Sequence, residues 1–208
     1  MSIFGQSYGR NITGRIYKDG QEIRVRSVPE AIRHGIAYVS EDRKRYGLNL
    51  IEDVRRNVSA AGLFKLARKG FVNGNEELKV AEEYRTSLNV KTPTVMSLVG
   101  KLSGGNQQKV VLSKWLYTDP DVLILDEPTR GIDVGAKYEI YTIVNRMVAA
   151  GKAVVVISSE LPELLGISDR VYAISEGHIT GELPIEQATP ESLMQLMTKE
   201  KEADHVLS

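Results

Sequence analysis

The chain of 208 residues contains no cysteine. This absence excludes disulfide bridges, thiolate metal sites and cysteine nucleophiles, and it fits a reducing compartment such as the cytoplasm. The chain also lacks a net charge, because its 27 Lys and Arg residues are balanced by 27 Asp and Glu residues. No overall field draws the chain to nucleic acid or to an anionic membrane surface, so any partner has to be recognised locally.

Long apolar segments are also absent from the sequence. No apolar run approaches the ~20 residues that a spanning helix needs, and the first residues show no basic segment followed by an apolar stretch. If the protein serves a membrane, we expect it to do so from outside the bilayer. The hydrophobic content of 42% is enough for one packed core, with at most a small appended subdomain.

The N-terminal part combines a hairpin with short elements. Residues 12–26 alternate around Asp19-Gly20, a pair that favours positive φ, which indicates a β-hairpin. Pro29 is typical of the start of a short helix. Residues 36–39 form a brief apolar strand, and the charged residues 40–46 are predicted to form a loop.

A helical insert is predicted in the middle of the chain. Residues 53–97 have the least strand-like composition, and residues 80–88 have a helical one. We therefore divide the chain into a core of residues 1–50 and 99–208 and a helical subdomain of residues 51–98.

The pattern becomes regular from residue 102 onward. Apolar strands at 122–125 and 154–157 alternate with helical segments, and such runs indicate parallel strands covered on both faces. Residues 171–179 turn at Glu176-Gly177 and indicate a hairpin at the edge, before a charged tail that we expect to be frayed. Helical spacing gives the helix between the two strands a buried stripe of Ile140, Ile143, Val144, Met147 and Val148.

Two adjacent carboxylates, Asp126 and Glu127, follow the strand at 122–125. Open α/β sheets bind ligands at this end of their strands. In a nucleotide site the first carboxylate can hold Mg²⁺, usually through water, and the second can orient or activate the attacking water. The alternative is a solvated acidic turn, which Asp-Glu alone would favour. The extension by Pro128 and Thr129 after four apolar residues favours the site.

A second motif opens the preceding helix with a serine and two glycines, in Leu102-Ser-Gly-Gly-Asn-Gln-Gln-Lys109. Free amides at a helix N-terminus, beside glycines that let the backbone approach closely, make an anion site suited to phosphate. The alternative is an ordinary helix cap, in which Ser103 satisfies the first amides. Taken alone, the segment would favour the cap.

Together, the two motifs resemble the ABC ATPase family. Residues 102–106 match the family signature, although Asn106 stands where Gln is usual, residues 122–127 match the Walker B strand, and residues 131–133 match the D-loop. The resemblance covers nearly the whole chain. It implies an α/β fold, namely a RecA-like P-loop NTPase core with a helical subdomain and edge hairpins.

The phosphate-binding loop of that family is missing from the sequence. Its Gly-x-x-x-x-Gly-Lys-Ser/Thr pattern holds the phosphates and Mg²⁺. In this chain Gly100-Lys101 and Gly151-Lys152 are followed by Leu102 and Ala153, so neither pair can be that loop. Because the match begins on the helix that would follow the loop, we expect a truncated domain. Alone, it should bind ATP weakly or not at all, and it should be inactive.

Two further positions depart from the family pattern. Glu41 stands where the Q-loop glutamine is expected, and Ser159 stands where the switch histidine is expected. A hydroxyl cannot replace an imidazole in contacting the γ-phosphate and orienting water. This combination, with the stretch from Tyr38 to Gly47, resembles the C-terminal domain of the tandem ATPases that energise ribose, galactose and xylose import.

The resemblance also implies which residues contact nucleotide, because two such domains meet head to tail in this family. The signature would complete an ATP site built on the N-terminal half of the same full-length protein, while the carboxylates would belong to a second, impaired site. The implied catalytic residues are Glu127 and Asp126, with Asp126 also the metal ligand. The implied ATP-binding residues are Ser103, Gly104, Gly105, Asn106, Glu41, Asp133 and Ser159.

The implied cofactors are ATP and Mg²⁺. The implied partners are transmembrane permease subunits, near the loop at 41–47, and indirectly a periplasmic sugar-binding protein, which gives a cytoplasmic location at the inner face of the membrane. One alternative is a non-catalytic module that donates the signature and binds a transmembrane subunit. Another is a soluble ABC protein of DNA repair or translation, which the neutral charge and the lack of long coiled-coil heptads disfavour. We expect no nucleic-acid partner.

Overall fold

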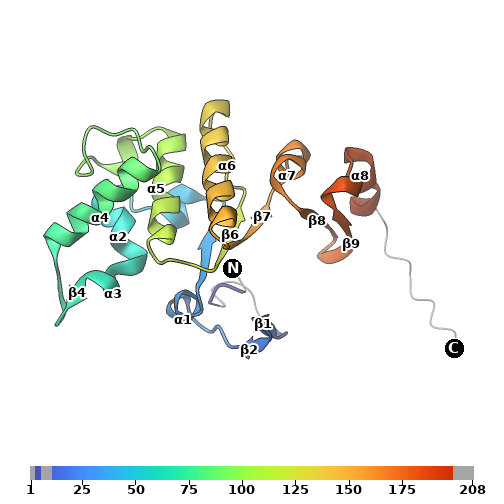
Figure 1. Cartoon of the computed structure of the whole chain (residues 1–208), viewed down its shortest axis with the longest axis horizontal. Coiled ribbons are helices and arrows are strands. Elements are labelled where there is room, and N and C mark those ends of the chain that lie inside the picture. The colour runs from blue at the N-terminus through green and yellow to red at the C-terminus, as the bar shows by residue number, and fades with distance from the viewer. Residues whose placement is uncertain (1–2, 6–10, 199–208) are drawn as a thin grey trace, which may run out of the picture. The chain divides into compact units, whose positions relative to one another are not determined.

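A computed structural model describes residues 3–5 and 11–198 of the chain (Figure 1). The chain divides into two compact units, Met1–Ile157 and Ser158–Ser208. The division predicted from sequence, with a helical subdomain at residues 51–98, does not use this boundary and stays a prediction.

A three-stranded parallel sheet forms the centre of the first unit. Its order is β3 (Ile36–Val39), β6 (Val122–Asp126) and β7 (Ala153–Ile157). Val39 lies opposite Leu125, and Asp126 lies opposite Ile157. The three C-terminal ends therefore meet at one edge of the sheet. The apolar runs of the sequence predicted these parallel strands correctly.

The expectation that the strands are covered on both faces is wrong for β7. Val154 and Val156 pack against the main core, whereas Val155 and Ile157 are 49% and 47% exposed. Alternate residues of a strand point to opposite faces, so one face of β7 is left partly open by the described residues. Within the described residues β7 pairs with β6 alone, which makes it an edge strand there.

Helices α5 (Gly104–Leu116) and α6 (Val134–Ala149) pack beside this sheet. The predicted buried stripe of α6 is confirmed except at Val148, which is 47% exposed. At 100° per residue Val148 lies about 80° from Ile140 around the helix, at the margin of the stripe. The core that these elements share includes Val39, Leu112, Leu123, Leu125, Ile140 and Val144.

The helical insert contains α2 (Val54–Ser59), α3 (Leu63–Leu66) and α4 (Gly74–Ser87), as the composition predicted. Side-chain caps fix the starts of two of these helices, because Asp53 accepts from the amide of Arg56 and Asn73 accepts from the amides that follow it. The sequence did not predict the small antiparallel pair of β4 (Ala67–Arg68) and β5 (Phe71–Val72). Short 3₁₀ turns lie at Ala60–Gly62 and Val99–Lys101.

The N-terminal elements follow the prediction. Strands β1 (Ile16–Lys18) and β2 (Gln21–Ile23) form the hairpin, with Asp19 and Gly20 at φ of 52° and 76°. Helix α1 (Val28–Arg33) follows.

The loop predicted at residues 40–46 needs a correction. Residues Arg43–Gly47 form a π-helical turn, η1. Asp42 caps this turn, because its carboxylate accepts from the amides of Lys44 and Arg45 at 3.1 and 3.0 Å. The cap gives the charged segment a fixed conformation that its composition did not indicate.

The second unit holds α7 (Leu161–Ile167), β8 (Arg170–Ser175), β9 (His178–Pro184), a 3₁₀ turn (Ile185–Gln187) and α8 (Pro190–Met197). The predicted hairpin is confirmed, with positive φ at Glu176 and Gly177. Helix α8 was not predicted; it contacts β8 and buries Leu193. The charged tail from residue 199 lies outside the described residues. No helix in the described part of the chain is long and apolar enough to cross a membrane.

Candidate functional site

The paired carboxylates lie where the sequence placed them, at the C-terminal end of β6. Asp126 is the last residue of the strand, and Glu127 follows it with a φ of 46°. Such a positive φ is uncommon for a residue with a side chain. It is held here by a hydrogen bond from the Glu127 amide to the carbonyl of Ile157 at 2.8 Å. The backbone directly after β6 is therefore fixed by the neighbouring strand β7.

Asp126 is held by a residue that sequence reasoning missed. The Tyr38 hydroxyl, on β3, donates a hydrogen bond to Oδ2 of Asp126 at 2.5 Å. Burial first, and then this bond to a carboxylate, raises the pKa of Tyr38 above its ordinary value of 10.0. The phenol therefore remains a donor at neutral pH. A usable signal was present, since a tyrosine in a buried strand usually finds a partner for its hydroxyl.

Glu41 lies near the same edge of the sheet. Because Val39 pairs with Leu125, Glu41 and Glu127 each stand two residues beyond that pair. The carboxylate of Glu41 forms an ion pair with the guanidinium of Arg130. Arg43 also reaches this segment, and its Nη1 donates to the carbonyl of Arg130 at 3.0 Å. Sequence reasoning gave neither arginine a role in the site.

The N-terminus of α5 differs from an ordinary helix cap. Ser103 is the N-cap residue, yet its side chain makes no capping hydrogen bond to the amides of the first turn within the described structure. Its Oγ instead accepts from Nδ2 of Asn106 at 2.8 Å. Oδ1 of Asn106 accepts from the amide of Lys91 at 2.7 Å. The capping alternative requires the Ser103 side chain to accept hydrogen bonds from the first amides of α5. In the described structure it does not do so.

The two signature glycines are needed for different reasons. A Cβ on Gly104 would stand 2.8 Å from Nη2 of Arg43 and 3.2 Å from the carbonyl oxygen of Gly131, so glycine lets the Arg43 guanidinium and this carbonyl approach the start of α5 closely. A Cβ on Gly105 would stand 2.5 Å from the Cβ of Ala136, where α5 packs against α6. Gly105 thus permits close helix packing.

Asp133 has a structural task in the first unit. It is the N-cap of α6, and its side chain accepts from the amide of Ala136 at 2.9 Å. Ser159 belongs to the second unit, directly after Ser158, whose hydroxyl contacts the carboxylate of Glu163. The roles assigned to Asp133 and Ser159 in ATP binding stay predictions.

The described side chains show which oxygen atoms could serve as ligands for Mg²⁺. Among the described residues, no group of three or more His, Asp or Glu side chains could hold a metal ion. Mg²⁺ is commonly bound through one or two carboxylates, with waters and substrate phosphates as its other ligands. Asp126, fixed by Tyr38, fits that partial role.

Comparison with known proteins settles the family. The family model described as ABC transporter matches residues 2–130.

The chain belongs to the ABC transporter family.

Curated members of the family resemble it closely. The L-arabinose transport ATP-binding protein AraG of Geobacillus stearothermophilus is 58% identical over 199 residues, which cover 96% of this chain and 39% of that protein. The xylose import ATP-binding protein XylG of Thermoanaerobacter pseudethanolicus is 53% identical over 197 residues, covering 95% and 39%. The chain thus spans well under half the length of these relatives.

Solved ABC cassettes share the fold. A nucleotide-free ATP-binding cassette from an ABC transporter aligns with a TM-score of 0.72 at 19% identity, over 96% of this chain and 82% of that one. The dimeric bacterial ABC transporter cassette MJ0796 aligns with a TM-score of 0.70 at 22% identity, over 83% and 74%. The chain therefore has the ABC ATPase cassette fold, as its sequence predicted.

Proposed function

We propose that the chain is the ATP-binding domain of an importer for a simple sugar. Its signature segment would complete an ATP site built on a second nucleotide-binding domain, the N-terminal half of the same full-length protein. The names of the relatives, which concern L-arabinose and xylose, support the substrate class. Specificity for one sugar would belong to other subunits.

The observation that carries this proposal is the open N-terminus of α5. Its first amides are not capped by Ser103, and the cationic guanidinium of Arg43 lies against Gly104, where a Cβ would stand 2.8 Å from Nη2. Amides at a helix N-terminus, with the helix dipole behind them, favour a bound phosphate. The segment therefore suits the phosphates of a nucleotide whose other contacts would come from a second domain.

The second proposed site lies at the end of β6, where the chain's own residues have separable tasks. Asp126 would hold Mg²⁺, with Tyr38 fixing one carboxylate oxygen. Glu127 would orient a water molecule toward the γ-phosphate. Glu41 and Ser159 stand where the family has glutamine and histidine, and Glu41 is already paired with Arg130. We infer that this site hydrolyses ATP poorly.

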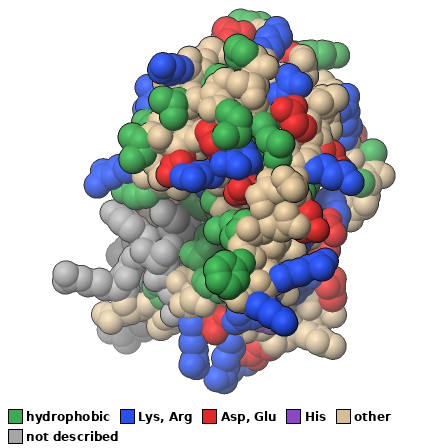
Figure 2. Space-filling model, turned by 90° about the vertical axis from the view of Figure 1, so that its left-hand side faces the viewer, with side chains coloured by type: hydrophobic (Ala, Val, Ile, Leu, Met, Phe, Trp, Pro, Cys, Tyr) green, Lys and Arg blue, Asp and Glu red, His purple; other side chains and the backbone are tan. Residues whose placement is uncertain are grey.

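The proposal extends to partners and location. Transmembrane permease subunits would contact the first unit near residues 41–47, and a periplasmic sugar-binding protein would act through them. The chain would lie in the cytoplasm, at the inner face of the membrane. Charge supports a protein partner over nucleic acid, since Lys, Arg, Asp and Glu side chains are interspersed on the face seen in Figure 2.

The non-catalytic alternative concerns the 208-residue chain by itself, whose sequence holds no phosphate loop. Because that loop supplies most phosphate contacts, we expect no useful affinity of the isolated chain for MgATP in a calorimetric titration. Low-micromolar binding, about −8 kcal/mol, would contradict this.

Steady-state ATPase activity of the reconstituted full-length transporter tests the proposed function. Gly104→Asp should abolish hydrolysis, because a side chain and a negative charge would block the approach of phosphate to α5. Glu127→Gln should do much less, because its own site is already impaired. Gly74→Asp is the matched control: Gly74 also begins a helix, and a Cβ there meets nothing within 4 Å. A silent Gly104→Asp would remove the signature assignment, and an equally damaging Glu127→Gln would remove the impaired site.

A further inference from the structure

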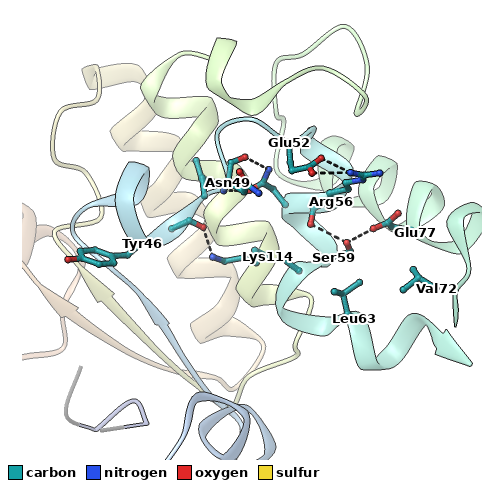
Figure 3. Close-up of a pocket in the computed structure, with 13 residues that line it drawn as sticks. Tyr46, Asn49, Glu52, Arg56, Ser59, Leu63, Val72, Glu77 and Lys114 are labelled. Atoms are coloured by element: carbon teal, nitrogen blue, oxygen red, sulfur yellow. Dashed lines mark hydrogen bonds and ion pairs between the residues drawn. The ribbon is translucent and has the colours of Figure 1, made fainter. Parts of the chain in front are cut away.

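A small hollow in the N-terminal part of the first unit differs in charge from the larger cavity between the helical insert and the core. The larger one, of about 560 Å³, has carboxylates that are paired with cations (Figure 3). Glu52, for example, accepts from Nη1 of Arg56 at 2.8 and 3.0 Å. The small hollow, of about 340 Å³, is lined by Arg24, Arg26, Glu30, Arg33 and His34. Three guanidinium groups therefore stand against one carboxylate.

Two separate elements bring these cations together. Arg24 and Arg26 follow β2 and are exposed, while Val25 between them is 3% exposed and packs in the core beneath α1. This buried residue anchors the segment, so the arginines on either side of it lie at the surface. Arg33 is the last residue of α1, and its side chain is 68% exposed. The cations are thus presented to solvent by a packed part of the fold.

Glu30, the one carboxylate of the lining, has a structural task. Its Oε2 accepts from the backbone amide of Arg26 at 2.7 Å, which ties the segment before α1 to the helix. Its Oε1 lies 4.0 Å from Nη2 of Arg33, at the limit of an ion pair. Within the described part of the chain, the side chains of Arg24 and Arg26 form neither an ion pair nor a hydrogen bond. Two guanidinium groups therefore remain without a counter-charge.

The chemistry of the lining favours a phosphate group as the missing anion. The planar fork of a guanidinium bonds two phosphate oxygens at once, and three such groups can share the charge of a dianion. Guanidinium groups held close together also repel one another, and a bound dianion relieves that repulsion.

The size and polarity of the hollow favour a small molecule over a macromolecule. Among the described residues, those that line it are all charged or imidazole side chains, so an apolar protein surface would find no complementary group there. No aromatic ring in the lining could stack on a nucleic-acid base. The volume lies near the lower end of small-molecule sites, which span roughly 300–1,000 Å³.

We propose that this hollow binds the phosphate group of a small phosphate monoester, with Arg24 and Arg26 reaching it from the segment after β2 and Arg33 from α1. The lining shares no residue with the ATP sites proposed above. The inference therefore goes beyond the proposed function and does not depend on it.

Calorimetric titration of the 208-residue chain tests the proposal, with inorganic phosphate and ribose 5-phosphate as probes and uncharged ribose as the reference. We expect both phosphates to bind with a dissociation constant of about 1 mM or lower, and ribose not to bind. Arg24→Gln and Arg26→Gln should each weaken binding at least fivefold. Arg26→Lys keeps the charge but loses the fork, so it should weaken binding at least threefold.

Arg68→Gln is the matched control. Arg68 is an exposed arginine of the same unit that does not line the hollow, so its replacement changes the net charge equally. It should leave binding within twofold of the wild type. Because the side chains of Arg24 and Arg26 have no partner among the described residues, we expect their variants to fold, and urea denaturation verifies this. The titration of the unaltered chain does not depend on any variant.

Several outcomes would overturn the inference. Neither phosphate binds the unaltered chain, or Arg24→Gln and Arg26→Gln bind as well as Arg68→Gln, which would place the phosphate elsewhere. Equal binding by Arg26→Lys and the wild type would reduce the hollow to an unspecific positive charge. A lipid source is tested by cosedimentation with phosphatidylcholine vesicles that contain phosphatidic acid: binding to these vesicles without binding of either soluble phosphate would replace the small molecule by a membrane surface.

Discussion

The phenol of Tyr38 donates a hydrogen bond to the carboxylate of Asp126 at 2.5 Å, across the neighbouring strands β3 and β6. The bond connects residues 88 positions apart in the sequence and fixes the carboxylate proposed to hold Mg²⁺. Hydrogen bonds to charged groups contribute about 1.5–3 kcal/mol. Tyr38→Phe keeps the ring that packs in the core and removes only the donor, so we expect it to lower the free energy of unfolding by about 2 kcal/mol.

Urea denaturation measures this difference, with Tyr138→Phe as control because Tyr138 is 74% exposed. The pH dependence adds a second test. The folded-state pKa of Tyr38 is raised above its ordinary value of 10.0, so the folded state keeps its proton longer than the unfolded state. The contribution of Tyr38 is therefore complete below pH 10 and falls as the pH rises above it. An unchanged difference between the wild type and Tyr38→Phe up to pH 11 would contradict this assignment.

A buried lysine on α5 supports a prediction at acid pH. Lys109 is 1% exposed, and its ammonium lies 2.5 Å from Oε2 of Glu139 and donates to the carbonyl of Asn89 at 2.6 Å. The hydrogen bond from Lys109 holds the pKa of Glu139 below its ordinary value of 4.5. Glu139→Gln leaves the ammonium without its counter-charge. Because the Glu139 side chain is 33% exposed, we expect a modest loss of about 1–2 kcal/mol at pH 7.

The sign of the pH effect follows from the lowered pKa. The contribution of Glu139 is complete above pH 4.5 and is lost as the pH falls, because the unfolded state then takes up a proton more readily. The difference between the wild type and Glu139→Gln should therefore shrink on acidification. Urea titrations at pH 7 and pH 3 measure it, with the exposed Glu83→Gln as control. A difference that is equally large at both pH values would mean that the ion pair is not its source.

The sequence predicted the strands well because their signal is local. Runs such as Val122 to Leu125 are apolar and rich in branched residues. Asp19 and Gly20 are residue types that adopt positive φ, so this pair alone indicates the turn of its hairpin. The family motifs located Asp126 and Glu127 because the residues of each motif are also neighbours in the sequence.

What the sequence could not predict depends on distant neighbours. Tyr38 acquires its role from a carboxylate on another strand, and Lys114 acquires its burial from the elements that surround α5. Coverage of β7 depends on which elements lie against each face, so the exposure of Val155 was not visible in its apolar run. The turn at η1 depends on one cap, Asp42, inside a segment whose charge suggested a loop.

Gly105 gives the most direct test of how the signature helix packs. Its missing Cβ would lie 2.5 Å from the Cβ of Ala136, and neither helix backbone can yield easily at the crossing of α5 and α6. Overpacking of this kind costs about 1–3 kcal/mol, against the gain of up to about 1 kcal/mol that alanine brings to a helix. We therefore expect Gly105→Ala to lower the free energy of unfolding by about 1–2 kcal/mol.

A second substitution separates this clash from other effects of the alanine. Ala136→Gly removes the atom that the new Cβ would meet, so the double variant should be more stable than the sum of the two single effects predicts, by at least about 1 kcal/mol. Gly74→Ala is the control, since a Cβ there meets nothing within 4 Å, and it should change stability by less than about 1 kcal/mol. Urea denaturation of the four variants and the wild type provides the measurement. Strictly additive effects of Gly105→Ala and Ala136→Gly would show that the two helices do not meet at this pair. Gly105 would then need another explanation, such as the ligand approach that we propose for Gly104.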